Sequence, residues 1–148
     1  MSTLYKKVNG SRISMSEEEV VDYNNNQPSP EERLQNCQNQ RIFQLQKNRK
    51  SYQYKDIDLN GTRYIATKIA SDNLSGIIQV MEDNGLTETV WLNSDDEQIT
   101  LSLADAKALR TVIFTQQSFA YLAEADKKAE INDPDKTISE IEAINIDF

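Results

Sequence analysis

The sequence contains no histidine and a single cysteine, Cys37. Without histidine, Ser-His catalysis, Cys-His catalysis and histidine-ligated zinc sites are excluded. One cysteine cannot form an intramolecular disulfide, and on a helical face it is ordinarily a small apolar residue. We therefore expect a protein that is not an enzyme, with no catalytic residue, no metal site and no cofactor.

Glycine and long apolar runs are also scarce. The glycines are scattered at Gly10, Gly61, Gly76 and Gly85, so neither a Walker loop nor a dinucleotide-binding fingerprint can be written. The N-terminal residues lack an apolar stretch of signal-peptide length, and no apolar run elsewhere approaches the roughly 18 residues that a membrane span needs. We expect a chain made in the cytoplasm, with no bound nucleotide and no membrane contact.

Acidic residues outnumber basic residues by 24 to 16, which gives a formal net charge of -8 and a pI near 4.6. This charge repels nucleic-acid phosphates and anionic lipids, so nucleic acid is not an expected partner. Hydrophobic residues make up only 38% and the mean hydropathy is -0.66. We expect one modest domain with arms that are extended or buried only against partners.

The first part of the chain, residues 1–27, predicts an N-terminal arm. Two short β segments within residues 4–15 flank an Asn-Gly-Ser turn, which is typical of a small hairpin. Ser16 and Glu19 have the spacing of a capping box at the start of a short helix. A polar segment with two prolines, residues 24–30, then predicts a linker between this arm and the following helix.

The next segment, residues 28–50, predicts an amphipathic helix. Ser29, Pro30 and Glu32 form a strong helix start, since proline suits the first helical position and serine with glutamate three residues later forms a capping box. The apolar stripe is narrow and consists of Leu34, Cys37, Arg41, Ile42 and Leu45. Such a stripe fits packing against a second copy or another protein, and it also fits a helix that lies along its own domain.

Residues 51–132 predict a compact α/β module. Asn60-Gly61 predicts a hairpin with a type I′ turn, and a helix follows over residues 68–83. A second hairpin turns at residues 94–97, and a long helix then runs to about Ile131. Residues 133–148 form a C-terminal tail with a short helical segment and an apolar end. The predicted class is therefore α+β: an N-terminal β arm and helix, then β-hairpin, helix, β-hairpin and long helix.

Three features resemble functional sites, and each has a simpler structural interpretation. The acidic turn at residues 94–97 lacks the spacing of an EF-hand loop, so we interpret it as solvated. Trp91 is expected to anchor the core rather than to stack on a ligand. Tyr52, Tyr54 and Tyr64 lie among basic residues, and we interpret them as cross-strand packing rather than as a nucleic-acid platform. No site residue is predicted.

The order of motifs between Ile42 and Ile131 carries a resemblance. Six motifs follow one another along the chain. They are a basic helix end, a hairpin containing glycine, a helix start of the form Thr-x-x-x-Ser, an apolar helix, a strand containing tryptophan, and a Thr-Leu-Ser step that leads into a long helix. They correspond to Asn48-Arg49-Lys50, Asn60-Gly61, Thr67 with Ser71, Ile77-Ile78, Val90-Trp91 and Thr100-Leu101-Ser102. This order resembles a phage domain of unknown function found near the C-terminus of small proteins encoded among tail and tail-fibre genes. The opening residues 4–19 are similar to the start of many phage tail-associated proteins.

The resemblance implies a non-enzymatic bacteriophage virion protein, a tail, baseplate or fibre-attachment component that contacts other phage structural proteins and further copies of itself. It implies a location in the virion after synthesis in the host cytoplasm. We expect the β arm, the helix at residues 29–50 and the apolar C-terminus to contact neighbouring subunits. One alternative is a tail or tail-fibre assembly chaperone that is absent from the mature virion. Another is an acidic inhibitor of a host protein.

Overall fold

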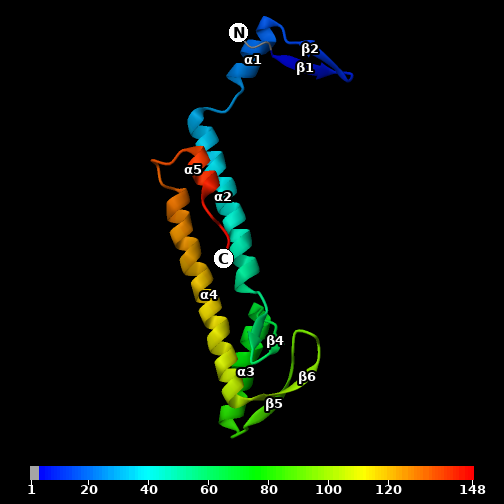
Figure 1. Cartoon of the computed structure of the whole chain (residues 1–148), viewed down its shortest axis with the longest axis vertical. Coiled ribbons are helices and arrows are strands. Elements are labelled where there is room, and N and C mark those ends of the chain that lie inside the picture. Colours follow the sequence, from blue (N-terminus) through cyan, green and yellow to red (C-terminus); the bar gives the residue numbers. More distant parts are fainter. Residues whose placement is uncertain (1–3) are drawn as a thin grey trace. The chain divides into compact units, whose positions relative to one another are not determined.

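The computed structural model describes residues 4–148, so residues 1–3 of the predicted arm lie outside it (Figure 1). The chain divides into two compact units, the first ending at Asn36 and the second spanning Cys37–Phe148. Five helices and three two-stranded antiparallel sheets make up the described residues. The fold is α+β, which confirms the class predicted from the sequence.

The first unit opens with a β-hairpin made of β1 (Tyr5–Val8) and β2 (Ser11–Ser14). Asn9 and Gly10 at the turn both have positive φ, 49° and 84°, which is the left-handed geometry of a type I′ turn. All residues of both strands are exposed, and the following helix α1 (Glu17–Asn25) has no buried residue. These elements are therefore built by turn and cap chemistry, without a core of their own.

Local polar contacts hold the start of α1. The Ser16 hydroxyl accepts from the backbone N–H of Glu19, and the Glu19 carboxylate accepts from the backbone N–H of Ser16, which is the predicted capping box. Glu19 also pairs with Lys6 of β1. The hydrogen bond from the Lys6 ammonium, together with the cap, holds the pKa of Glu19 below its usual value.

Helix α2 (Pro30–Gln53) begins in the first unit and ends in the second. Ser29 and Glu32 form the predicted capping box at its start, with distances of 2.7 and 3.1 Å. The helix extends past the predicted end at residue 50 and includes Tyr52. The prediction that Tyr52 packs across strands is therefore wrong, because this residue is helical.

The rest of the second unit alternates short hairpins with helices. Two predicted helices have the bounds expected from their caps, because the hydroxyls of Thr67 and Ser102 accept from the backbone N–H groups of Ala70 and Asp105. The elements are β3 (Ile57–Leu59), β4 (Thr62–Tyr64), α3 (Lys68–Asp83), β5 (Glu88–Leu92), β6 (Gln98–Ser102), α4 (Leu103–Ile131) and α5 (Ile138–Ala143).

Helix α4 organises the second unit. One part of α4 packs on α3 and the hairpins, while the other part lies along α2, with α5 and the C-terminal segment beside both (Figure 1). Trp91 is half-buried against the core, in agreement with the role predicted for it. The core residues are Ile57, Tyr64, Ala66, Leu74, Ile78, Leu101, Ala106, Leu109 and Ile113.

Candidate interaction surfaces

The C-terminal segment covers the line along which α2 and α4 meet. Ile141, Ile144 and Ile146 are buried, with exposures of 0%, 6% and 7%. The Arg41 guanidinium of α2 donates to the carbonyl of Ile144, and the Asn48 amide donates to the carbonyl of Ile146 at 3.3 Å. The apolar C-terminus was expected to contact a neighbouring subunit, and this expectation is corrected: its isoleucines are buried within the same chain.

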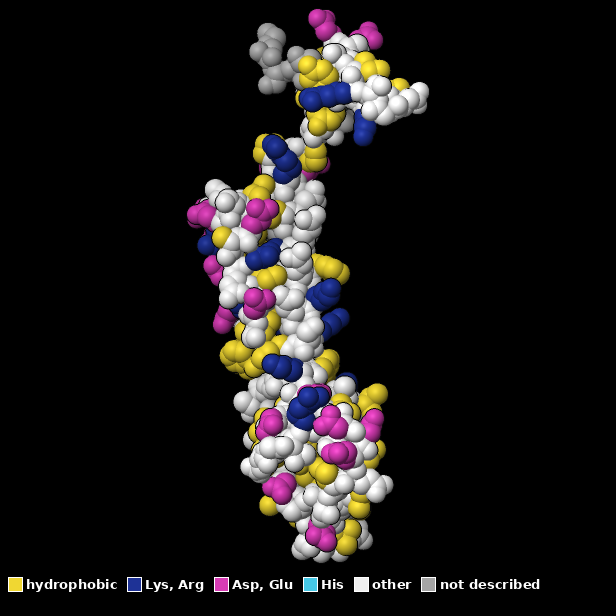
Figure 2. Space-filling model, turned by 45° about the vertical axis from the view of Figure 1, so that its right-hand side comes forward, with side chains coloured by type: hydrophobic (Ala, Val, Ile, Leu, Met, Phe, Trp, Pro, Cys, Tyr) yellow, Lys and Arg dark blue, Asp and Glu magenta, His cyan; other side chains and the backbone are white. Residues whose placement is uncertain are grey.

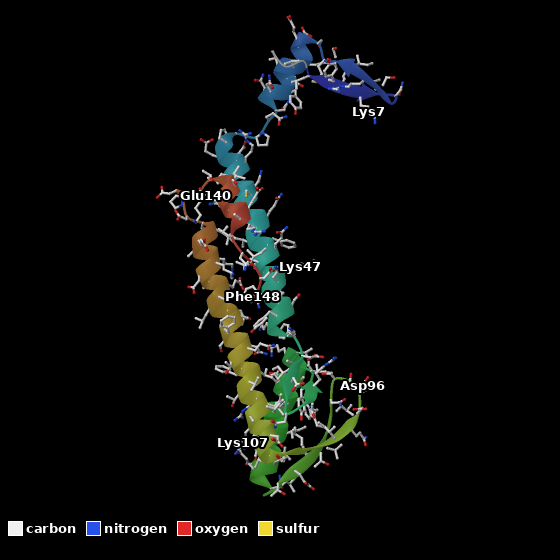
Figure 3. The ribbon with its side chains drawn as sticks, viewed as in Figure 1. Lys7, Lys47, Asp96, Lys107, Glu140 and Phe148 are labelled. Atoms are coloured by element: carbon white, nitrogen blue, oxygen red, sulfur yellow. The ribbon has the colours of Figure 1, made fainter. Side chains whose placement is uncertain are left out.

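The last residue, Phe148, closes this arrangement with an aromatic cluster. Its ring stacks on Tyr52 at a centroid distance of 5.9 Å, and Tyr52 in turn meets Phe119 of α4 at 5.9 Å. Figure 3 shows Phe148 beside α2 and α4. Tyr52 therefore packs between α4 and the C-terminus, and Tyr64 packs in the core.

A charged group lies buried between α2 and α4. Glu124 Oε2 is 2.5 Å from Arg49 Nε, and Glu124 Oε1 is 2.5 Å from Lys128 Nζ. The side chains of Arg49 and Glu124 are only 12% and 8% exposed. Burial acts to raise the pKa of Glu124, but Lys128 and Arg49 outweigh it, so the pKa lies below its ordinary value. Glu124 is therefore ionised at neutral pH and joins the two helices.

Further polar contacts fix how α2 ends against α4. The Gln116 amide of α4 donates to the carbonyls of Tyr52 and Lys55 at 3.0 and 2.9 Å. The Arg49 guanidinium lies 4.6 Å from the ring centroid of Tyr121. The carbonyl of Tyr52 also accepts from the backbone N–H of Lys55 at 3.1 Å, so Gln116 adds a second donor at the end of α2 and ties this end to α4. Within the second unit the α2 stripe faces its own domain, because Leu45 is fully buried and Arg41 donates to the carbonyl of Ile144. This is one of the two interpretations open from the sequence.

Helix α4 also carries exposed apolar side chains outside the core, among them Phe119 beside Tyr52. Val112, Phe119 and Leu122 are 38%, 53% and 69% exposed. Between Thr111 and Ala125 the only charged residue is Glu124, and it is buried. Figure 2 shows hydrophobic side chains gathered on the surface at the height of the middle of α4. We define the outer face of α4 as Ala108, Val112, Thr115, Phe119 and Leu122.

A second apolar surface lies between the start of α3 and the hairpin of β5 and β6. Ile65, Ile69, Val90 and Leu92 line a groove of about 510 Å³, together with the half-buried Trp91. Val90 and Leu92 are exposed because side chains alternate along β5 and Trp91 points to the core. The strand is therefore apolar on both faces, which is typical of a strand covered on both sides.

The acidic turn at residues 94–97 is organised by Asn93, a residue that the sequence interpretation did not single out. Its side-chain oxygen accepts from the backbone N–H groups of Asp95 and Glu97, each at 2.9 Å, and its amide donates to the Glu97 carboxylate at 2.9 Å. Asp96 has a positive φ of 60° and lies at the tip of the hairpin (Figure 3). Within residues 4–148, no group of three or more His, Cys, Asp and Glu residues is placed to hold a metal ion.

The lone cysteine is part of the packing of α2. Cys37 is half-buried and reduced in the structure. Burial, together with the negative charge of Glu142, raises the pKa of its thiol, although Arg41 acts in the opposite direction. Because the thiolate is the reactive form, this thiol is a weak nucleophile at neutral pH.

These features define a class: a small α+β domain whose long helix is buried on one side and apolar on the exposed side. No helix within the described residues is long and apolar enough to cross a membrane. The pattern of a family described as a domain of unknown function (DUF4376) matches residues 37–147, which is most of the chain and nearly the whole second unit. The chain belongs to this family. No curated protein and no solved structure matches the chain.

Proposed function

We propose that this chain is a non-enzymatic structural component of a bacteriophage particle, in the tail, baseplate or fibre-attachment region, and that it acts through protein contacts. The resemblance of residues 42–131 to a domain of phage tail-region proteins motivates the phage assignment. The observation that carries the contact role is the uncharged, exposed outer face of α4. Exposed apolar patches of this kind mark interaction sites, because soluble monomers rarely leave them open.

The first unit supports the same role. Its strands and α1 have no buried residue, while Tyr5, Val8, Ile13, Val21 and Tyr23 are exposed. An isolated two-stranded hairpin is marginally stable in water, and three or more strands or a packed helix are needed for independent stability. We infer that the first unit gains its stability from a neighbouring protein, as expected for an arm in an assembly.

In this proposal the partners are other phage structural proteins and further copies of the chain. The second unit supplies a domain with its own core, and the first unit supplies an arm for contacts. An assembly chaperone would use the same exposed apolar surfaces to hold a tail or fibre protein during folding. The two functions differ in one respect, which is whether the chain remains in the finished particle.

Quantitative mass spectrometry of purified particles and of infected-cell lysate tests this difference. A structural part is expected in particles at a fixed copy number relative to the major capsid protein. An abundant host cytosolic protein, measured in the same preparations, controls for carry-over. Abundance in the lysate combined with absence from the particles would contradict the structural role and favour the chaperone.

A further inference from the structure

The outer face of α4 has the spacing of a coiled-coil seam. Ala108, Val112, Thr115, Phe119 and Leu122 follow one another at alternating steps of four and three residues, and all are exposed. This is the heptad pattern in which every first and fourth position faces a partner helix. The core of the second unit uses other positions of α4. Phe119 meets Tyr52 of the same chain on one side but remains 53% exposed, so the outer face is a second apolar seam that the chain leaves largely open.

The composition of this seam suits pairing with an identical seam. The span from Thr111 to Ala125 has no exposed charge, because Glu124 is buried. Two copies of a chain with a net charge of -8 repel each other, and this face lets them meet without like charges in contact.

We propose that the outer face of α4 pairs with the same face of a second copy, with the two helices antiparallel. Asp126 continues the seam by one step beyond Leu122. A parallel pair would place the two Asp126 carboxylates against each other, which is destabilising. In the antiparallel pair Val112 faces Leu122 of the second copy, and Asp126 faces Ala108, so the two Asp126 carboxylates lie at opposite ends of the seam.

This inference deepens the proposed function, since association of copies is part of it, but its test requires only the purified full chain. The mass of the chain in solution is measured by sedimentation velocity over a concentration series. The wild type is expected to shift from monomer to dimer as the concentration rises. A result against self-association would leave the presence or absence of the chain in phage particles undecided, so the two proposals fail separately.

Charge substitutions then locate the seam and fix its direction. Val112→Glu and Leu122→Lys each place two unpaired charges in the dimer, and each is expected to raise the dimer dissociation constant about 100-fold or more. In the antiparallel arrangement, a chain carrying both substitutions brings each glutamate opposite a lysine of the second copy. The double variant should therefore recover most of the dimer affinity. Val80→Glu, at an exposed position of α3, is the matched control and should leave the dimer unchanged.

Each other outcome overturns the proposal. A wild type that stays monomeric at the highest concentration excludes the pair, and a trimer mass excludes a two-fold arrangement. Single variants that dimerise like the wild type place the contact elsewhere on the chain. A double variant as monomeric as the single variants contradicts the antiparallel direction, since in a parallel pair like charges would meet at both positions. Circular dichroism of each variant confirms that the helices are intact.

Discussion

The two units use their apolar residues in opposite ways. In the second unit, Leu74, Ile78, Leu109 and Ile113 are each 1% exposed and form a continuous core. In the first unit, Ile13 and the other apolar residues remain exposed, and the hairpin and α1 depend on turns, caps and one ion pair. The difference teaches that only the second unit has the buried surface for independent stability. It is also the unit to which the family pattern applies.

The largest effect on stability is expected when isoleucine is replaced by alanine in the second unit, and the same substitution in the first unit provides the comparison. Ile113→Ala removes a side chain from the core and should lower the free energy of unfolding by about 2–5 kcal/mol. Ile13→Ala removes a side chain that is 46% exposed in β2, and should change it by about 0.5 kcal/mol or less. Urea unfolding followed by circular dichroism measures both. Similar losses in the two variants would show that the first unit shares the core.

The next effect concerns the buried charge between α2 and α4. Glu124→Gln leaves Arg49 and Lys128 without their carboxylate and should cost about 3 kcal/mol in urea unfolding. The control is Glu130→Gln in the same helix, where the carboxylate is 51% exposed and 3.8 Å from Lys136. This exposed pair should contribute less than about 1 kcal/mol. Equal losses in the two variants would contradict a special role for the buried pair.

The same carboxylate gives the second unit a predicted pH dependence. The pKa of Glu124 is lowered in the folded state, so its contribution to stability is complete above the unfolded value of about 4.3. The contribution is lost as the pH falls through the folded pKa. The difference in melting temperature between wild type and Glu124→Gln should therefore shrink below about pH 4. A difference that stays constant down to pH 2 would contradict an ionised Glu124 in the fold.

The smallest effect on stability is expected for glycine-to-alanine substitutions in the turns of two hairpins, one in each unit. Gly10 and Gly61 occupy the same left-handed turn position, with φ of 84° and 80°, and an added Cβ would meet no atom within 4 Å at either site. Gly61→Ala should lower the stability of the second unit by about 1 kcal/mol through backbone strain alone. Gly10→Ala strains a hairpin outside the core and should leave the main unfolding transition unchanged. A shift of that transition in both variants would show that the hairpins are coupled.

Much of the fold could be predicted because local chemistry determines it. Thr67 and Ser102 cap helices whose bounds the sequence predicts, and Asn60-Gly61 has the left-handed geometry expected of a type I′ turn. These signals lie within a few residues of the elements that they define. The classification as α+β follows from them directly.

The remaining features depend on contacts between distant segments. Helix α2 continues to Gln53 where Gln116, 63 residues away, donates to its last carbonyls. The C-terminal isoleucines resemble a docking peptide in the sequence, and only the structure shows that α2 and α4 cover them. The sequence did contain an indication of the outer face of α4, because residues 111–125 include only one charged residue, Glu124. The exposure of this face becomes clear only when the core-facing positions are known.

Hydrogen exchange of the free full chain, resolved by segment, tests the contrast between the units most directly. The account predicts strong protection of α3 and of the core-facing part of α4. It predicts exchange close to the unstructured rate in β1, β2 and α1, because their hydrogen bonds are exposed and no core closes over them. Protection of the first unit equal to that of α4 in the monomeric chain would contradict the claim that only the second unit is stable alone.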